Sequence, residues 1–293
     1  MAGPEATAGE MLAEVVGDLV ARIGAKTPAA LADEPDAVHQ LRTTVRRLRN
    51  VLAAFSPYVE PTAIGGLRAR LAEYGDRLGL PRDLEVRAAW CARIAAEIGL
   101  PGDLRDDLVA PLLAEHARAH AALVAWAASP DAEPLSTALG AAAAAPALTD
   151  GSARPAPVVA REVLLAQAAR VIDQTTDYRR DPEAAHALRR AGRRLRHVGD
   201  AVTKPPAAVL GPEAAALGEL GSRVQSLLGD HRDALLLADH LRGSRPDQAG
   251  VRAAYASMVE AAERAAGTAL ASVPAVLEQL EALVGRAPTT VPP

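Results

Sequence analysis

The sequence predicts an all-α protein made of two similar four-helix-type bundles, and three observations support this. Nearly half of the 293 residues are hydrophobic but only 2% are aromatic, so Ala, Leu and Val supply most of the apolar surface, a composition typical of closely packed helices. Apolar residues recur at helical spacing. One helical pattern occurs twice. We therefore expect bundles over 10–129 and 158–285, joined by a linker over 130–157.

Five helices are expected in the first half. The first covers 10–24, where apolar positions follow helical spacing. The second begins after Pro35, a residue that suits the first turn of a helix, and runs over 36–55. Further proline residues separate the remaining three, which are expected over 61–78, 82–98 and 103–128.

The segment 130–157 is rich in Ala, Pro, Gly, Ser and Thr, which suits a connection better than a core element. After it the same order of long helices is expected, over 158–178, 182–202, 212–228, 233–241 and 246–284.

Two pairs of segments indicate an internal duplication. PDAVHQLRTTVRRLR (35–49) aligns without gaps with PEAAHALRRAGRRLR (182–196), and RLGLPRDLEV (77–86) aligns with LLGDHRDALL (227–236). The paired histidines lie 147 positions apart and the paired Arg-Asp positions lie 150 apart. Because the two offsets are nearly equal and the matches are collinear, chance similarity is a poor explanation.

The repeated helix carries a basic stripe. A helix turns about 100° per residue, so His39, Arg42, Arg46 and Arg49 fall within about 80° of one another. Leu41 and Leu48 occupy the neighbouring sector, so the stripe borders the buried face. The second copy repeats the stripe with His186, Arg189, Arg193 and Arg196, and Arg190 and His197 flank it. Arg47 and Arg194 lie further round the helix in the two copies.

Each stripe lacks acidic residues within its own helix, between positions 39 and 55 and between 186 and 196. Like charges three and four positions apart repel each other, which suggests a bound anion. The alternative is an ion-pair network with acids from other helices, for which the candidates are Glu73, Asp76, Asp83 and Asp233. The repeated phase favours the anion, because two stripes facing each other across a pseudo-twofold axis would form one long basic groove.

The charge composition is consistent with a local anion site. The formal net charge of -4 argues against a protein that coats nucleic acid non-specifically. Only Lys26 and Lys204 of the 32 basic residues are lysine, and the guanidinium fork of arginine suits phosphate oxyanions.

The repeated residues resemble the CHAD family, the conserved histidine α-helical domain, whose helix pattern is H-x-x-R-x-x-x-R-R-x-R in each half. The family's later Leu-Gly and Arg-Asp pairs are matched at Leu78, Gly79, Arg82 and Asp83, and at Leu228, Gly229, Arg232 and Asp233. The resemblance implies two four-helix bundles related by pseudo-twofold symmetry. It also implies a basic surface or cavity that binds inorganic polyphosphate, and association with polyphosphate granules.

The expected polyphosphate contacts are His39, Arg42, Arg46, Arg47, Arg49, His186, Arg189, Arg190, Arg193, Arg194, Arg196 and His197, with Arg82 and Arg232 as additional contacts. Asp83 and Asp233 are expected to cap a helix or orient an arginine. Gly192 lies inside the second motif helix, where it departs from the usual family pattern and lowers the helix propensity.

No catalytic motif, cofactor or metal is expected. The E-x-E-x-K strand signature of the CYTH domain, to which many relatives are fused, is absent, so the stand-alone form is predicted. His116 and His120 lie one helical turn apart, but no further cluster of ligands completes a metal site. With the single Cys91, no secretory signal and no membrane span, we expect a cytoplasmic protein.

Three other functions remain open from the sequence. His39 and His186 titrate near neutral pH, so a phosphohydrolase or phosphotransferase acting on polyphosphate or phosphate esters is one. Single-stranded nucleic acid is disfavoured, because the few aromatic residues fall outside both stripes. A scaffold that recruits another protein is the third.

Overall fold

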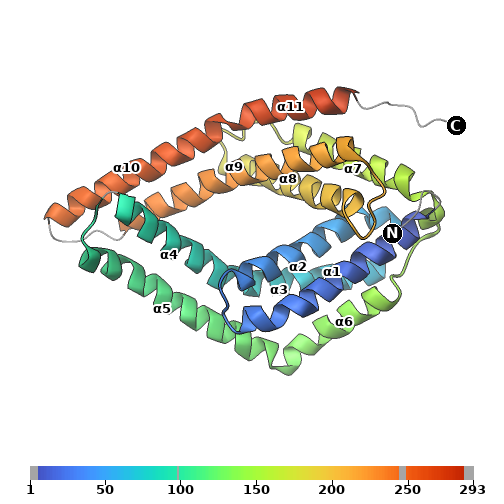
Figure 1. Ribbon diagram of the computed structural model, residues 1–293, viewed down its shortest axis with the longest axis horizontal. Helices are drawn as coiled ribbons and strands as arrows, with labels where there is room; N and C mark the ends of the chain where they lie inside the picture. The colour runs from blue at the N-terminus through green and yellow to red at the C-terminus, as the bar shows by residue number, and fades with distance from the viewer. Residues whose placement is uncertain (1–5, 98, 244–248, 287–293) are drawn as a thin grey trace.

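The computed structural model describes residues 6–97, 99–243 and 249–286, with side chains omitted for 249–251. Within these ranges the regular structure is helical, accompanied by two isolated β-bridges, Thr7 with Pro155 and Val59 with Leu148 (Figure 1). The all-α expectation is confirmed. The described part of the chain contains no helix long and apolar enough to cross a membrane.

The first half forms five long helices: α1 (Ala8–Leu31), α2 (Ala37–Ala54), α3 (Pro61–Arg77), α4 (Gly79–Glu97) and α5 (Gly102–Ala127). Helix α1 starts earlier than its apolar pattern indicates, because Thr7 and Glu10 form a reciprocal cap. The Thr7 hydroxyl accepts from the Glu10 amide at 3.2 Å, and the Glu10 carboxylate accepts from the Thr7 amide at 2.8 Å.

The segment expected to be a linker contains a helix, α6 (Glu133–Ala144). Its Leu135 and Leu139 are buried, and the helix packs on α1 and α3. The Ala-rich composition, which suggested a connection, also favours a helix, and two leucines one turn apart give it an apolar face. The expectation for 130–157 is therefore corrected, because this segment contributes to the core.

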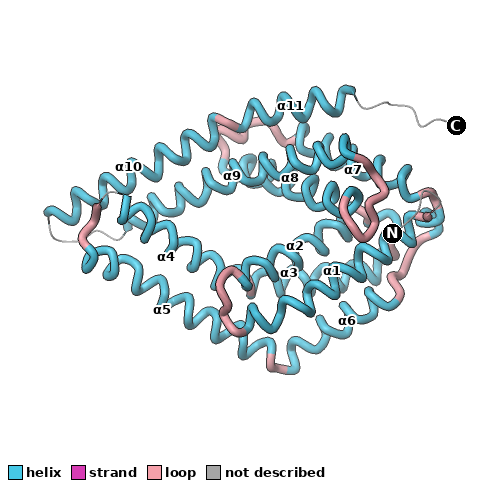
Figure 2. The backbone as a smooth tube through the Cα atoms, viewed as in Figure 1, coloured by secondary structure: helices cyan, strands magenta, loops and turns pink. Residues whose placement is uncertain are grey.

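The second half contains α7 (Ala156–Asp173), α8 (Pro182–Thr203), α9 (Pro212–Gly243), α10 (Ala249–Ala271) and α11 (Val273–Arg286) (Figure 2). Helix α9 is continuous where two helices were expected, whereas its counterparts α3 and α4 meet at Leu78. The last expected helix, 246–284, is divided at Ser272, and its residues 246–248 lie outside the described residues.

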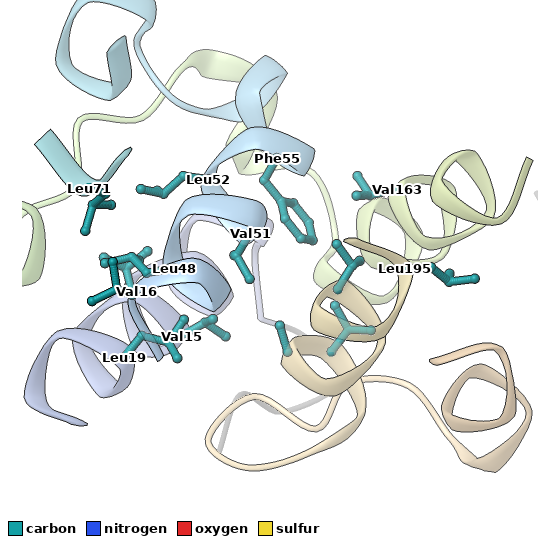
Figure 3. Packing of buried hydrophobic residues seen from close by; sticks show 14 of the residues in the cluster. Val15, Val16, Leu19, Leu48, Val51, Leu52, Phe55, Leu71, Val163 and Leu195 are labelled. Carbon is teal, nitrogen blue, oxygen red and sulfur yellow. The ribbon is translucent and has the colours of Figure 1, made fainter. Parts of the chain in front are cut away.

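Two hydrophobic cores hold the helices together. The larger core joins α1, α2, α3 and α6 to α7, α8 and α11, and in Figure 3 Val51 and Phe55 of α2 face the helices that carry Val163 and Leu195. The smaller core joins α4 and α5 to the C-terminal part of α9 and to α10, around Cys91 and Met258. Both cores take side chains from each half of the chain, so the halves depend on each other for their packing.

Candidate anion-binding site

Helices α2 and α8, which carry the two basic stripes, pack against each other. Nδ2 of Asn50 donates to Nδ1 of His197 across this contact, at 2.9 Å. The two residues are 147 positions apart and therefore occupy equivalent positions when the alignment of the repeats is continued. Equivalent residues meet at the point where a pseudo-twofold axis would pass between the two helices. Both stripes therefore lie on the same side of the helix pair.

The stripes converge on one cavity of about 480 Å³, lined by α2, α4, α8 and α9. Six stripe residues line it: His39, Arg42, Arg46, His186, Arg189 and Arg193. Arg82 and Arg232, expected as additional contacts, also line it, as does Arg87, which the sequence did not single out. Seven arginines thus face two carboxylates, Asp83 and Asp233, in one cavity.

A glycine lies under the same arginine in each repeat. A Cβ atom added to Gly79 would lie 3.2 Å from Nη2 of Arg42, and one added to Gly229 would lie 3.1 Å from Nη2 of Arg189. An alanine at either position would require the guanidinium group to shift by a few tenths of an ångström. The Leu-Gly pair of each repeat therefore combines a buried leucine with the space that one cavity arginine needs.

Ion pairs neutralise only part of the site. Nη1 of Arg42 lies 2.7 Å from Oδ1 of Asp83, so this aspartate orients an arginine as expected. Arg82 pairs with Glu85 at 2.9 Å and more weakly with Asp36 at 3.4 Å. In the part of the chain that the structure describes, no ion pair joins Arg46, Arg189 or Arg193 to a carboxylate at 4.0 Å or less. The alternative of a complete ion-pair network therefore fails for the centre of the stripes.

Arg46 and Arg193 carry charges in an unfavourable setting. Burial, followed by repulsion from neighbouring arginines, lowers the pKa of Arg46 to about 10 and that of Arg193 to about 8. The Nε atoms of Arg46, Arg189 and Arg193 are buried and have no hydrogen-bond partner among the described residues. Arginine keeps its proton in proteins, so these lowered pKa values reflect charges that an anion in the cavity would stabilise.

The pKa values of the two cavity histidines, His39 and His186, are lowered by the same kind of environment. Burial lowers the pKa of His39, with a further contribution from Arg82. Burial also lowers the pKa of His186, with a further contribution from Arg190. Phosphate oxygens close to these rings would favour the protonated form and raise both pKa values.

The sequence model of the CHAD domain family matches residues 14–242. The chain belongs to the CHAD domain family. Its all-helical fold, the two repeated histidine motifs and their shared cavity agree with this membership.

Two curated relatives of this CHAD domain come from Mycobacterium tuberculosis. It is 29% identical to the uncharacterized protein Rv2226 of strain H37Rv over 223 residues, which are 73% of this chain and 41% of that protein. It is 28% identical to the uncharacterized protein MT2285 of strain CDC 1551 over the same length. The chain thus spans 41% of the length of these relatives.

Two solved structures share the fold. PptA from Streptomyces chartreusis superposes with a TM-score of 0.67 at 20% identity, covering 94% of this chain and 100% of that one. The CHAD domain from the plant Ricinus communis gives a TM-score of 0.62 at 21% identity, covering 97% of this chain and 94% of that one. At these identities the likeness concerns the fold alone.

Some expected contact residues of this CHAD domain do not line the cavity. His197 is only 1% exposed and bonds to Asn50, and Arg47 pairs with Asp200 at 2.8 Å. Neither side chain lines the cavity, so the cavity gives no support to the expectation that His197 and Arg47 contact an anion. Arg190 and Arg194 also lie outside the cavity.

Arg49 and Arg196 occupy equivalent places at the edge of the site. Nη1 of Arg196 donates to Oε1 of Gln225, which lines the cavity, at 3.3 Å. Arg49 lies beside Gly75, which holds the position 150 residues before Gln225. In each repeat the last arginine of the stripe therefore extends toward the helix that follows it.

Gly192 has a packing role that its helix propensity concealed. A Cβ atom at this position would lie 2.9 Å from the carbonyl oxygen of Gly221, and one at Gly199 would lie 2.8 Å from the Cα atom of Gly218. These four glycines let α8 and α9 approach backbone to backbone. Gly192 therefore positions the second wall of the cavity rather than weakening it.

Trp90 falls outside both basic stripes, as the sequence indicated, but it lines the cavity from α4. The Arg93 guanidinium lies 4.7 Å from the centre of its ring system. Helical spacing from the motif helix could not show this, because Trp90 lies on a different helix.

His116 and His120 connect helices. His116 bonds through Nδ1 to the carbonyl oxygen of Pro81 at 2.9 Å and through Nε2 to Asp33 at 3.1 Å. His120 donates through Nε2 to the carbonyl oxygen of Ala30 at 2.9 Å. They fasten α5 to the end of α1 and the start of α4. Among the described residues no group of three or more His, Cys, Asp or Glu side chains is arranged to hold a metal ion.

Proposed function

We propose that this CHAD domain binds inorganic polyphosphate in the cavity between α2 and α8, without converting it chemically. The observation that carries the proposal is the convergence of both basic stripes on one cavity, with the buried Nε atoms of Arg46, Arg189 and Arg193 unsatisfied. Guanidinium groups bind phosphate oxygens with two parallel hydrogen bonds. Arginines contributed by four helices call for a ligand that carries many charges along its length, and polyphosphate has this property.

Binding without catalysis is supported by what the cavity residues are. Apart from the carboxylates of Asp83 and Asp233, the charged side chains of the cavity are arginines, and the sequence contains neither a phosphate-binding G-x-x-x-x-G-K-[ST] loop nor a nucleophile elbow. Nucleic acid is a weaker candidate ligand, because it needs successive stacking platforms and Trp90 is the single aromatic lining residue among those described. We also propose that the protein associates with polyphosphate granules in the cytoplasm, which colocalisation of a fluorescent fusion with stained granules tests.

The decisive experiment measures retention on immobilised polyphosphate. The variant Arg42→Ala/Arg46→Ala/Arg189→Ala/Arg193→Ala removes four cavity guanidiniums and should lose retention while keeping its helical circular dichroism. A matched variant removes four exposed arginines that do not line the cavity, Arg118, Arg223, Arg252 and Arg264, and should be retained almost as well as the unmodified chain. Undiminished retention of the cavity variant, or equal loss in both variants, would refute the site.

A second assay addresses catalysis. Purified protein is incubated with polyphosphate, with and without divalent cations, and free phosphate is measured. We expect no release above background. Release that disappears in His39→Gln or His186→Gln would overturn the proposal of binding without conversion.

A further inference from the structure

A second row of basic residues leaves the cavity along α8. His186, Arg190 and Arg194 follow one another at intervals of four residues, so they lie on one continuous face of the helix. His186 lines the cavity, Arg190 is exposed, and Arg194 lies further along the helix, outside the cavity. The row therefore connects the cavity with the surface near α3 and α7.

Other arginines gather around the outer end of this row. Arg68 of α3, Arg170 of α7 and Arg49 of α2 lie close enough to Arg194 to lower its pKa, in addition to the larger effect of burial. The Nε atoms of Arg68 and Arg194 are buried without a hydrogen-bond partner among the described residues, as is that of Arg47 in the first repeat, so the two repeats differ in their ion pairs and not in this respect. None of the ion pairs found in the described ranges includes Arg68, Arg170, Arg190 or Arg194.

The equivalent row of the first repeat has a different character. It reads His39, Thr43 and Arg47, so its middle position is uncharged. Nη2 of Arg47 donates to Oδ2 of Asp200 at 2.8 Å, and Asp200 also pairs with Lys204. Nearby, Asp18 pairs with Arg22 at 2.7 Å. On this face each of these three basic side chains is paired with a carboxylate, and Asp200 serves two of them.

The difference is encoded at equivalent positions. The first repeat has Ala53 where the second has Asp200, so Arg194 lacks the carboxylate that Arg47 has. The position equivalent to Arg68, 150 residues later, is Gly218. The second repeat therefore has no arginine that corresponds to Arg68. Two repeats that share their motif residues in the cavity therefore differ outside it: the arginines of one face lack carboxylate partners, and the basic residues of the other are paired.

We propose that a polyphosphate chain longer than the cavity leaves it in one direction, over Arg190 and Arg194 between α3, α7 and α8. The opposite face, around Arg47 and Asp200, does not take the chain, because its arginines are already paired. This inference rests on the proposed function and adds a directional path for the part of the ligand outside the cavity.

The variant Ala53→Asp tests the path by giving Arg194 the carboxylate that Asp200 gives Arg47. Two probes are titrated, tripolyphosphate, which the cavity holds, and long-chain polyphosphate, which extends beyond it. The affinity for the long chain should fall by about tenfold, since one charge-assisted contact is worth roughly that factor, while the affinity for tripolyphosphate stays the same. Ala53→Asn introduces a side chain of the same size as aspartate but without its charge. This variant should bind both probes like the unmodified chain.

A second variant guards against a local effect of the new aspartate. Arg194→Met keeps the apolar stem but removes the charge, and it should also weaken binding of the long chain alone. It should lower the slope of log affinity against log salt for that probe, because fewer counterions are released. If both variants leave long-chain binding intact, or weaken the two probes equally, the directional path is wrong.

The cavity variant Arg46→Met/Arg193→Met separates the two proposals. It should weaken the binding of tripolyphosphate and of long-chain polyphosphate to a similar extent. If it weakens the binding of neither probe, the proposed function itself is wrong. If it weakens both probes while Ala53→Asp and Arg194→Met change neither, the cavity stands and only the exit path falls.

Discussion

Asn50 and His197, which occupy equivalent positions of the two repeats, share one hydrogen bond of 2.9 Å at the contact between α2 and α8. His197 accepts it through Nδ1, so its ring is neutral in this arrangement. The bond lies at the contact of the two helices whose arginine stripes line a single cavity.

His197 should make the protein less stable in mild acid. Burial, and then the neighbouring Arg47 and Arg46, hold the pKa of His197 well below its usual 6.5. The unfolded chain therefore binds a proton that the folded chain does not, so stability is full above about pH 6.5 and decreases below it. Urea unfolding at about pH 7.5 and about pH 5.5 should show a smaller loss for His197→Asn than for the unmodified chain. Equal losses would contradict the assignment.

Arg193 should be unfavourable for stability and favourable for binding. Arg193→Met removes a buried, repelled charge and keeps most of the packed stem, so we expect a higher melting temperature without ligand. Tripolyphosphate should raise the melting temperature of the unmodified chain, through binding to the folded state, more than that of the variant. Arg118→Met, on an exposed surface, serves as the control. A lower melting temperature in Arg193→Met would show that the charge is already compensated.

Binding should strengthen as pH falls. Burial and nearby arginines lower the pKa values of His39 and His186 in the free protein, and bound phosphates raise them. Binding therefore takes up protons, and affinity rises as pH drops from about 8 toward 6. Titration calorimetry in that range should show that the affinity of His39→Gln/His186→Gln depends less on pH than that of the unmodified chain. The comparison of the two proteins also corrects for protonation of the ligand itself. If the double variant shows the same slope of affinity against pH, the two histidines do not contact the bound phosphates.

Gly79 and Gly229 should be required for binding more than for folding. Alanine at either position places a Cβ atom against the guanidinium of Arg42 or Arg189, which must then move. We expect weaker polyphosphate retention with an unaltered circular dichroism spectrum. Gly65→Ala is the matched control, because its added Cβ meets open space and alanine favours a helix by up to about 1 kcal/mol. Retention of Gly229→Ala equal to that of Gly65→Ala would count against the steric argument.

Gly192→Ala should destabilise the fold. The new Cβ lies 2.9 Å from a backbone oxygen of α9, so the two helices must separate, at a cost of about 1–3 kcal/mol. Chemical unfolding measures this cost, with Gly24→Ala, which meets open space, as the reference. A gain in stability, as simple helix propensity predicts, would disprove the close packing.

The phase of the basic stripes was predictable from the sequence, because helix periodicity fixes which side chains share a face. His39, Arg42 and Arg46 form one face of α2, and their counterparts form one face of α8, as the spacing indicated. The same periodicity could not separate Arg47 and His197 from the cavity residues, because their environment depends on which neighbouring helix covers them. Helix α6 was missed because an Ala-rich segment becomes a helix here by packing Leu135 and Leu139 on α1 and α3.

By itself the sequence determined the helical class, the duplication and the arginine rows, all of which follow from local periodicity and from repeated letters. The tertiary structure alone decided that the two rows share one cavity, that Gly79 and Gly229 make room for Arg42 and Arg189, and that Asp200 neutralises one face of the pair. The physical reason is that charges and volumes act through space, and residues about 150 positions apart come within bonding distance only when α2 and α8 pack in their common core.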